Sequence, residues 1–297
     1  MKYHVLLGQN CQIATTETGI IFQRIIKKND ILVEKIDEGD VVIFHPCKMC
    51  PLDNETIKKL KGKKLIVIGC YYKEDFKSLN NVLFIPSKKI HKNNCSSAIK
   101  RDKKILVHIG YGCNHKCFYC PIKKKEKFSR PPKDIIRDIG SAQEVELLMD
   151  DCASYEYKNY KLKDLLKIIK SKKIIIDYVY PSYLEKNKEF FIKNKNRIVI
   201  NTLPLQSGSK KILKLMNRND YTPEKIIKIS NLLKCNSLHL IFGHPEETWE
   251  DFKKTVNIAK KTKAENIAWF CYEIKKGTFD EKKYKNRRGC KRFSEKR

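Results

Sequence analysis

Three cysteines stand close together in the stretch Cys113-Asn-His-Lys-Cys117-Phe-Tyr-Cys120, which has the spacing C-x3-C-x2-C. A four-cysteine zinc site would need a second C-x2-C pair about 15–20 residues away, and none follows Cys120 at that distance. Three thiolates on one loop instead suit three irons of a four-iron cube. The fourth iron is then open to a small chelating molecule. We therefore expect a [4Fe–4S] cluster at Cys113, Cys117 and Cys120.

The elements that must position these cysteines alternate between strands and helices. The apolar run 105–109 leads directly into the first cysteine, so the loop follows the end of a strand. Helical spacing appears between the strands, for example at 251–261. Six strand–helix units fit a complete or partial (β/α) barrel, with an open doubly wound sheet as the alternative. The six expected strands are 105–109, 144–148, 173–179, 197–203, 237–242 and 266–272.

The first ninety residues show the same alternation with a shorter period. Apolar or β-branched runs predict strands, and helical spacing at 17–28 and 54–61 predicts helices between them. This alternation indicates an α/β unit with a mostly parallel sheet. The expected strands are 3–7, 40–44, 65–68 and 81–85.

A second group of cysteines follows these strands. Cys11, Cys47 and Cys70 each come shortly after the end of a predicted strand. The carboxyl ends of parallel strands gather on one edge of a sheet, where ligands bind. We therefore expect these three thiols to form a second three-cysteine cluster site. Cys50 makes a C-x2-C pair with Cys47 and is either a spare or a redox neighbour, and the remaining cysteines have no such pattern.

Composition divides the chain into four parts. We expect an N-terminal cluster domain over 1–90, a polar linker over 91–104 and a barrel over 105–279. The stretch 280–297 is almost wholly charged or polar and is predicted to be a solvated or disordered basic tail.

The chain is strongly basic. It has 297 residues with 63 Lys plus Arg against 34 Asp plus Glu, a formal net charge of +29, and its 41% hydrophobic content excludes a disordered basic tail as the whole molecule. Such a charge favours a polyanionic partner. The alternative is that a Lys-rich composition is a habit of the source genome and only solvates the surface.

No segment indicates export or membrane insertion. The apolar run at the N-terminus is too short for a signal peptide, and no apolar stretch approaches the roughly 18 residues that span a bilayer. We therefore expect a cytoplasmic protein without membrane contact. Its 12 cysteines, kept reduced there, favour metal binding or catalysis over disulfides.

The cysteine loop resembles that of the radical S-adenosylmethionine (SAM) enzymes. The resemblance implies that the open iron binds the amino and carboxylate groups of SAM, which is cleaved reductively to a 5′-deoxyadenosyl radical. Tyr119, just before the third cysteine, matches the aromatic position beside the adenine.

Further stretches resemble the methylthiotransferases within that family. In them a second [4Fe–4S] cluster, here implied at Cys11, Cys47 and Cys70, is tied to sulfur donation, and a partial (β/α)6 TIM-like barrel follows. The matching stretches are Ser129-Arg-Pro131, Glu144 through Tyr155, Leu205-Gln-Ser-Gly-Ser209, Leu215-Met-Asn-Arg218, Phe242 through Thr248, and Gly277-Thr278.

The resemblance implies replacement of an unreactive C–H by C–S–CH3. The substrate in this family is an adenosine beside a tRNA anticodon or an aspartate on a ribosomal protein, and the charge favours tRNA. The stretch 151–155 is closer to the archaeal and eukaryotic type, which acts on N6-threonylcarbamoyladenosine at tRNA position 37. An electron-donor protein is also implied. The alternatives are an enzyme that methylthiolates a protein side chain and a cluster-bearing RNA-binding protein that has lost catalysis.

Four polar residues are candidates for holding SAM. Asp150 and Asp151 end the second barrel strand and can bind the amino group or the ribose, or they simply cap the next segment. Gln206 and Arg218 are candidates for the SAM carboxylate or the substrate, because a guanidinium binds a carboxylate with two parallel hydrogen bonds.

The sequence departs from the methylthiotransferase pattern in several places. Gly-Cys-Gln is Asn10-Cys-Gln12 here, Asn-Thr-Cys is His45-Pro-Cys47, and Gly-Phe-Pro-Gly is Gly243-His-Pro-Glu246. Family members usually continue into a small RNA-binding β-barrel, which we expect to be lacking. RNA binding is then expected from the barrel face, the N-terminal domain and the basic tail.

Overall fold

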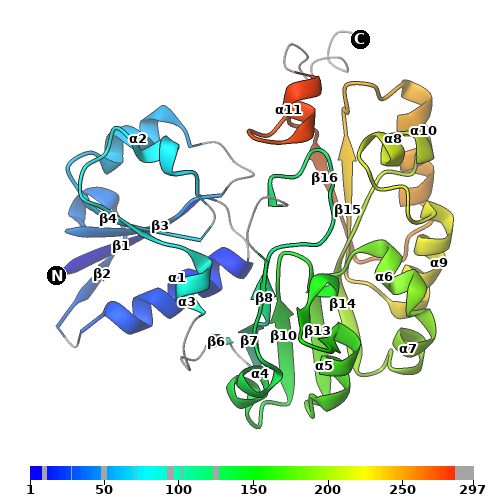
Figure 1. Cartoon of the computed structure of the whole chain (residues 1–297), viewed down its shortest axis with the longest axis horizontal. Coiled ribbons are helices and arrows are strands. Elements are labelled where there is room, and N and C mark those ends of the chain that lie inside the picture. The colour runs from blue at the N-terminus through cyan, green and yellow to red at the C-terminus, as the bar shows by residue number, and fades with distance from the viewer. Residues whose placement is uncertain are drawn as a thin grey trace. The chain divides into compact units, whose positions relative to one another are not determined.

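The computed structural model describes residues 1–8, 12–27, 29–47, 52–69, 71–91, 97–101, 103–122 and 127–284. The chain forms two compact units, coloured mainly blue to cyan and green to red in Figure 1. The first contains Met1–His108 and Lys133–Gly140, and the second contains Ile109–Pro132 and the chain from Ser141 onward. Both units combine strands and helices, which confirms the α/β class.

The first unit alternates strands and helices as its sequence predicts. Its elements are β1 (Lys2–Leu7), α1 (Gln12–Ile25), β2 (Ile31–Val33), η1 (Ile36–Glu38), β3 (Val41–His45), α2 (Asn54–Leu60), β4 (Lys64–Ile68), η2 (Lys73–Phe76), β5 (Val82–Ile85), α3 (Ser87–Ile90), β6 (Ala98–Arg101) and β7 (Lys104–His108).

The sheet of the first unit is parallel, with the order β2-β1-β3-β4-β5. The chain adds β2 on one side of β1 and all later strands on the other side. An open α/β sheet binds ligands at the carboxyl ends of its strands, next to such a reversal. The residues that follow β1 and β3 therefore occupy the natural ligand position of this fold.

β3 lies at the centre of this unit and is buried along its whole length. Val41 and Ile43 pack into a core with residues of α1 and α3, and Val42 and Phe44 pack into a core with Leu60 of α2. Figure 1 shows the helices on both faces of the sheet. A central parallel strand buried on both faces reads as a continuous apolar run, which is why the sequence identified it.

The second unit has the longer strand–helix period. Its elements, together with α4, are β8 (Gly110–Tyr111), β9 (Phe128–Ser129), α4 (Pro132–Ile139), β10 (Glu144–Leu148), η4 (Cys152–Ser154), β11 (Glu156–Tyr157), β12 (Tyr160–Lys161), α5 (Leu162–Ile168), β13 (Lys173–Tyr178), α6 (Pro181–Lys186), α7 (Lys188–Lys193), β14 (Ile198–Gln206), α8 (Lys210–Leu215), α9 (Pro223–Leu233), β15 (Ser237–Phe242), α10 (Trp249–Ala259), β16 (Asn266–Cys271) and α11 (Phe279–Lys283).

Five strands of this unit, β10, β13, β14, β15 and β16, are parallel and lie side by side in chain order. Each new strand is added on the same side, so the direction of winding never reverses among them. A doubly wound sheet reverses at a switch point, whereas a (β/α) barrel does not. The partial TIM-like barrel is therefore confirmed, and the doubly wound alternative is wrong.

Two stretches that were expected to lack regular structure contain an element. The stretch 91–104, expected to be a linker, contains β6, which pairs antiparallel with β7. Lys100 and Arg101 are exposed on β6, and this polarity hid the strand. The tail expected over 280–297 begins inside α11, whose N-terminus is capped by Thr278 Oγ1 accepting from Glu281 N at 3.2 Å, and residues 285–297 lie outside the described residues.

Within the described stretches, no helix combines the length and apolarity needed to cross a membrane.

Candidate active site

The loop that carries Cys113, Cys117 and Cys120 lies between β8 and β9, which pair with each other. Gly112 precedes the first cysteine with φ +87°, and a Cβ there would lie 2.9 Å from Lys127 Cα, so only glycine fits. Its N–H donates to Asp150 Oδ2 at 2.6 Å. Asp150 therefore holds the entry to the loop from the end of β10.

The rest of the loop is also fixed by backbone hydrogen bonds. Asn114 N donates to Ser154 Oγ at 2.9 Å, and Phe118 N donates to the carbonyl oxygen of Met216 at 3.1 Å. The Asn217 side chain donates to the Lys116 carbonyl at 2.9 Å. The loop is thus held by η4 on one side and by the segment after α8 on the other.

The thiols lie in an environment that favours a bound cation. Burial raises the pKa of Cys113, and the negative charge of Asp151 nearby raises it further. The Cys117 thiol is buried and accepts a hydrogen bond from Arg218 Nη1 at 3.3 Å. A buried thiolate needs a positive partner, and iron ions supply one. The donor set of three thiols on one short loop therefore fits three irons of a [4Fe–4S] cluster.

Arg218 is placed beside this loop by the turn that follows α8. It is 3% exposed, Nη2 donates to the Pro204 carbonyl at 2.6 Å and Nε donates to Tyr221 Oη at 3.0 Å. Its guanidinium also lies 4.3 Å from the centre of the Tyr180 ring. In this arrangement Arg218 contacts the Cys117 thiol, the Pro204 carbonyl and two tyrosine side chains.

Asp151 has the capping role that the sequence left open. It is the N-cap of η4, where Oδ1 accepts from Ala153 N at 3.2 Å and Oδ2 accepts from Ser154 Oγ at 2.6 Å. Oδ1 also accepts from Tyr180 N at 3.0 Å. Asp151 therefore joins β10 to the segment after β13 at the edge of the cysteine loop.

Gln206 ends β14 in a left-handed conformation, with φ +70°. Its side-chain oxygen Oε1 is buried and has no hydrogen-bond partner among the residues that the structure describes. Such an atom is costly unless a ligand completes it. Tyr119 is buried, with its ring edge-to-face to Tyr272 at a centroid distance of 6.4 Å, and burial raises the pKa of its hydroxyl.

Three residues near the cysteine loop were not singled out by the sequence. His115 stacks on the Tyr180 ring with a centroid distance of 3.3 Å, and its Nε2 lies 3.3 Å from Asp151 Oδ2. Ser154 Oγ lies 3.9 Å from the Cys113 sulfur. His115 stands inside the cysteine motif, so the sequence could have indicated it. Tyr180 has no such indication, because it comes near the cysteine loop only through the folding of the segment after β13.

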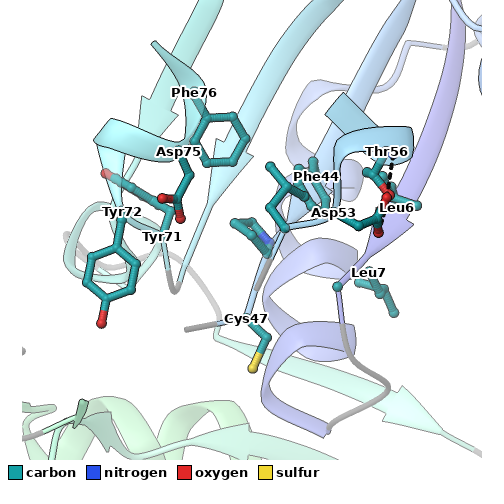
Figure 2. A pocket seen from close by; sticks show the side chains of 13 residues that line it. Leu6, Leu7, Phe44, Cys47, Asp53, Thr56, Tyr71, Tyr72, Asp75 and Phe76 are labelled. Carbon is teal, nitrogen blue, oxygen red and sulfur yellow. Dashed lines mark hydrogen bonds between the residues drawn. The ribbon is translucent and has the colours of Figure 1, made fainter. Parts of the chain in front are cut away.

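The first unit has a cavity of about 180 Å³ at the carboxyl ends of its strands. It is lined by Leu7 at the end of β1 and Gly8 after it, by Cys47 after β3, and by residues after β4 including Tyr71 and Asp75. Figure 2 shows the Cys47 thiol at this cavity. Cys11, Cys70 and Cys50 lie outside the described residues, so of the expected second group the structure places Cys47 alone.

A family model described as the radical SAM superfamily matches residues 107–259, which is more than half of the chain. This fold, with a three-cysteine loop at the end of a barrel strand, defines an enzyme that uses SAM and a [4Fe–4S] cluster. The chain belongs to the radical SAM superfamily.

Two relatives are similar over most of the chain. One is a tRNA-2-methylthio-N(6)-dimethylallyladenosine synthase of Fusobacterium nucleatum, 27% identical over 94% of this chain and 78% of its own. Another, of the same name, from Thermodesulfovibrio yellowstonii, is 29% identical over 90% of this chain and 75% of its own. Among solved structures, a queuine lyase from Clostridium spiroforme bound to SAM and queuine covers 61% of this chain and 81% of its own, at 17% identity and a TM-score of 0.37.

Proposed function

We propose that this chain is a tRNA methylthiotransferase, which replaces a C–H of an adenosine by C–S–CH3. One observation carries the proposal. A radical SAM cysteine loop lies in a chain that is similar, over about nine-tenths of its length, to synthases named for methylthio-adenosine in tRNA. The similarity extends into the part of the chain before residue 107, which the superfamily match does not cover.

In this proposal Cys113, Cys117 and Cys120 hold a [4Fe–4S] cluster with SAM on its open iron. When bound, this cluster supplies the electron that cleaves SAM. Arg218 orients Cys117 through a hydrogen bond to its sulfur, and Asp150 keeps the loop in place through the Gly112 N–H. We propose that an electron-donor protein reduces this cluster, as the resemblance to radical SAM enzymes implies.

Tyr119 and Gln206 are proposed to contact SAM or the substrate. Tyr119 stands inside the cysteine loop, where its buried ring can cover a purine. The side-chain oxygen of Gln206 accepts a hydrogen bond from no described residue, so it is available to a donor such as the SAM ammonium group. We propose that Asp151 acts indirectly, by fixing η4 against the loop.

The first unit is proposed to supply the sulfur. Cys11, Cys47 and Cys70 would hold a second [4Fe–4S] cluster, at the strand ends where the cavity containing Cys47 opens. This position agrees with the rule that open parallel sheets bind ligands beside the reversal of strand order. The methyl group comes from one SAM, and the hydrogen removed from the substrate leaves in 5′-deoxyadenosine from another.

The formal charge of +29 supports tRNA as the substrate. The relatives described above are named for N6-dimethylallyladenosine, so this nucleoside is the first candidate. N6-threonylcarbamoyladenosine, favoured by the stretch 151–155, is the second. A protein side chain and a role limited to RNA binding are the other outcomes of the experiment below.

The experiment is mass spectrometry of nucleosides from tRNA of cells with and without the gene. We expect a 2-methylthio derivative of one of the two adenosines to disappear in the deletion strain and to return when the gene is restored. A deletion strain with an unchanged set of methylthio-nucleosides would contradict the proposal. The identity of the nucleoside that disappears decides between the two candidates.

A further inference from the structure

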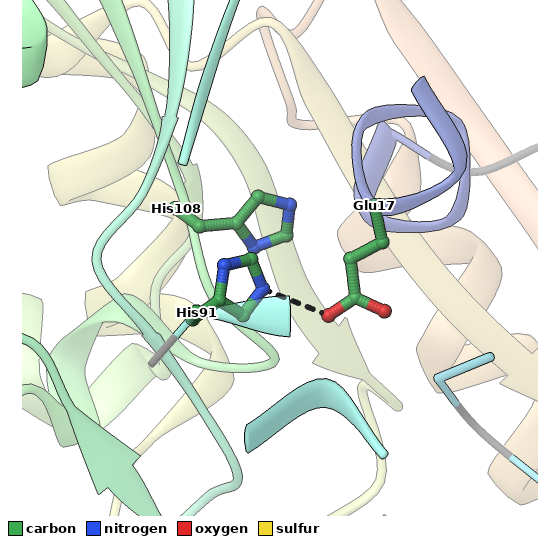
Figure 3. A group of neighbouring side chains, drawn as sticks. All are labelled: Glu17, His91 and His108. Atoms are coloured by element: carbon green, nitrogen blue, oxygen red, sulfur yellow. Dashed lines mark hydrogen bonds and ion pairs between the residues drawn. The ribbon is translucent and has the colours of Figure 1, made fainter. Parts of the chain in front are cut away.

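A buried group of acidic and imidazole side chains lies inside the first unit and has no part in the function proposed above. Glu17 lies on α1, His45 ends β3, His91 follows α3 and His108 ends β7. All four are at most 5% exposed. Figure 3 shows Glu17, His91 and His108 pointing toward one another.

The polar atoms of this group converge closely. Glu17 Oε1 lies 3.0 Å from His91 Nε2, and the rings of His91 and His108 are tilted against each other with centroids 4.5 Å apart. One ligand atom from each of the three residues lies within 4.8 Å of the other two. Two ligands on one tetrahedral zinc ion, each bound at about 2.0–2.1 Å, are about 3.3 Å apart. The Glu17–His91 separation is already close to that value, and the ligand atom of His108 lies within 4.8 Å of both.

The carboxylate of Glu17 needs a compensating positive charge. Burial raises its pKa, but the hydrogen bonds from His45 and His91 outweigh burial and keep the pKa well below its usual range, so the group is ionised. Among the described residues its ion-pair partners are histidines. The cation at this site is therefore a protonated imidazole or a metal ion.

His45 and His91 differ in how fully their nitrogens are used. His45 Nε2 lies 2.9 Å from Glu17 Oε2 and its Nδ1 lies 3.2 Å from the Pro46 carbonyl, so both nitrogens face oxygens. His91 Nδ1 is buried without a hydrogen-bond partner in the described part of the chain. Hydrogen bonds to Glu17 alone therefore do not explain why His91 is buried here with the ring of His108 packed against it.

We propose that Glu17, His91 and His108 bind a divalent transition-metal ion, with zinc as the first candidate. Two imidazoles and one carboxylate are a common donor set for such ions. His45 is the outer partner, which orients the carboxylate through its second oxygen as outer-shell groups do in metal sites. Gly69 leaves room for this contact, because a Cβ there would lie 2.0 Å from His45 Nε2.

The ion would tie together three segments that are distant in sequence. α1, the residue after α3 and the end of β7 would then share one anchor inside the first unit. The structural consequence is a stiffer scaffold beside β3, the strand that leads to Cys47.

The test uses the full-length protein, purified without oxygen and dialysed against buffer that contains no chelator. Elemental analysis is expected to find about one zinc ion per chain in addition to iron. Zinc K-edge X-ray absorption is expected to show a first shell of nitrogen and oxygen at about 2.0–2.1 Å. A sulfur shell at about 2.3 Å would instead place the zinc on cysteines and would overturn the proposal, as would the absence of zinc from folded protein.

Variants locate the ion. H91Q and H108Q are expected to lose the zinc and keep their iron. When zinc is added back after chelation, the wild type is expected to gain thermal stability and the two variants are not. H4Q is the matched control, because His4 lies in the same unit with Nδ1 3.2 Å from the Val33 carbonyl and away from Glu17. Zinc retained in full by folded H91Q and H108Q would overturn the assignment. The wild-type absorption spectrum tests the proposal even if a variant does not fold.

Discussion

The two groups of cysteines are distributed differently along the sequence. Cys113, Cys117 and Cys120 stand on one loop of the second unit, which hydrogen bonds from Asp150, Ser154 and Asn217 hold in place. Cys11, Cys47 and Cys70 follow three separate strands in the sequence, so the site proposed for them depends on the order of the strands in the sheet. The spacing of the cysteines in the sequence is enough to identify the first group. Identifying the second group requires the order of the strands in the whole first unit.

The surroundings of the two groups also differ. The Cys117 sulfur accepts a hydrogen bond from the buried guanidinium of Arg218. Cys47 instead borders a cavity that also has the carboxylates of Asp53 and Asp75 in its lining. We interpret this contrast as two separate tasks, SAM cleavage in the second unit and sulfur supply in the first.

Removing one ligand from the loop should have the largest effect. Cys113→Ala is expected to abolish the formation of 5′-deoxyadenosine and to remove about four irons per chain, because a cube loses one of its three anchors. Mass spectrometry of the product and iron analysis measure the two quantities. Cys235→Ala is the control, since Cys235 is buried at the end of α9 and outside the loop. Retained SAM cleavage in Cys113→Ala would break the assignment of this group.

Changing the cation beside Cys117 should have an intermediate effect. Arg218→Lys keeps the charge but cannot bond Cys117, Pro204 and Tyr221 together, as Arg218 does. We expect a loss of about 10–100-fold in cluster retention or SAM cleavage, the range found for outer-shell partners of metal sites. Activity equal to the wild type would show that the guanidinium is only structural.

The smallest effect concerns Glu247, which follows β15 in the second unit. Burial raises its pKa to about 7. The Glu247 carboxyl ionises at a lower pH in the unfolded chain than in the folded chain. The contribution of its protonated form to the stability of the fold is therefore lost as pH rises through about 7. Glu247→Gln should remove about 2 kcal/mol of this pH-dependent loss between about pH 5 and pH 7, at about 1.4 kcal/mol for each pKa unit.

Thermal unfolding at several pH values measures the difference. Glu250→Gln is the control, because the Glu250 side chain is 72% exposed and pairs with Lys253. Identical pH dependence of wild type and Glu247→Gln would contradict the buried position of this carboxyl.

The sequence predicted most of the strands because their apolar runs are continuous. β10 and β15 have the predicted bounds, and the C-x3-C-x2-C spacing identified the loop. The sequence did not predict β6, because two of its four residues are exposed cations. The contacts of Tyr180 and Arg218 with the loop could not be predicted, since they depend on how segments after different strands pack.

The sequence did not predict the group around Glu17, for a similar reason. Its four residues come from four separate elements, and none of them has a ligand spacing in the sequence. His45 appeared only as a departure from the Asn-Thr-Cys pattern. The structure shows that this departure pairs with Glu17 at 2.9 Å.

The division of tasks between the two groups of cysteines is tested most directly with Cys47→Ala. The measurement is mass spectrometry of 5′-deoxyadenosine and of methylthio-nucleosides in one reaction with SAM, a reductant and tRNA. We predict that 5′-deoxyadenosine still forms while the methylthio-nucleoside is lost. A methylthio-nucleoside formed at the wild-type level by Cys47→Ala would contradict the account.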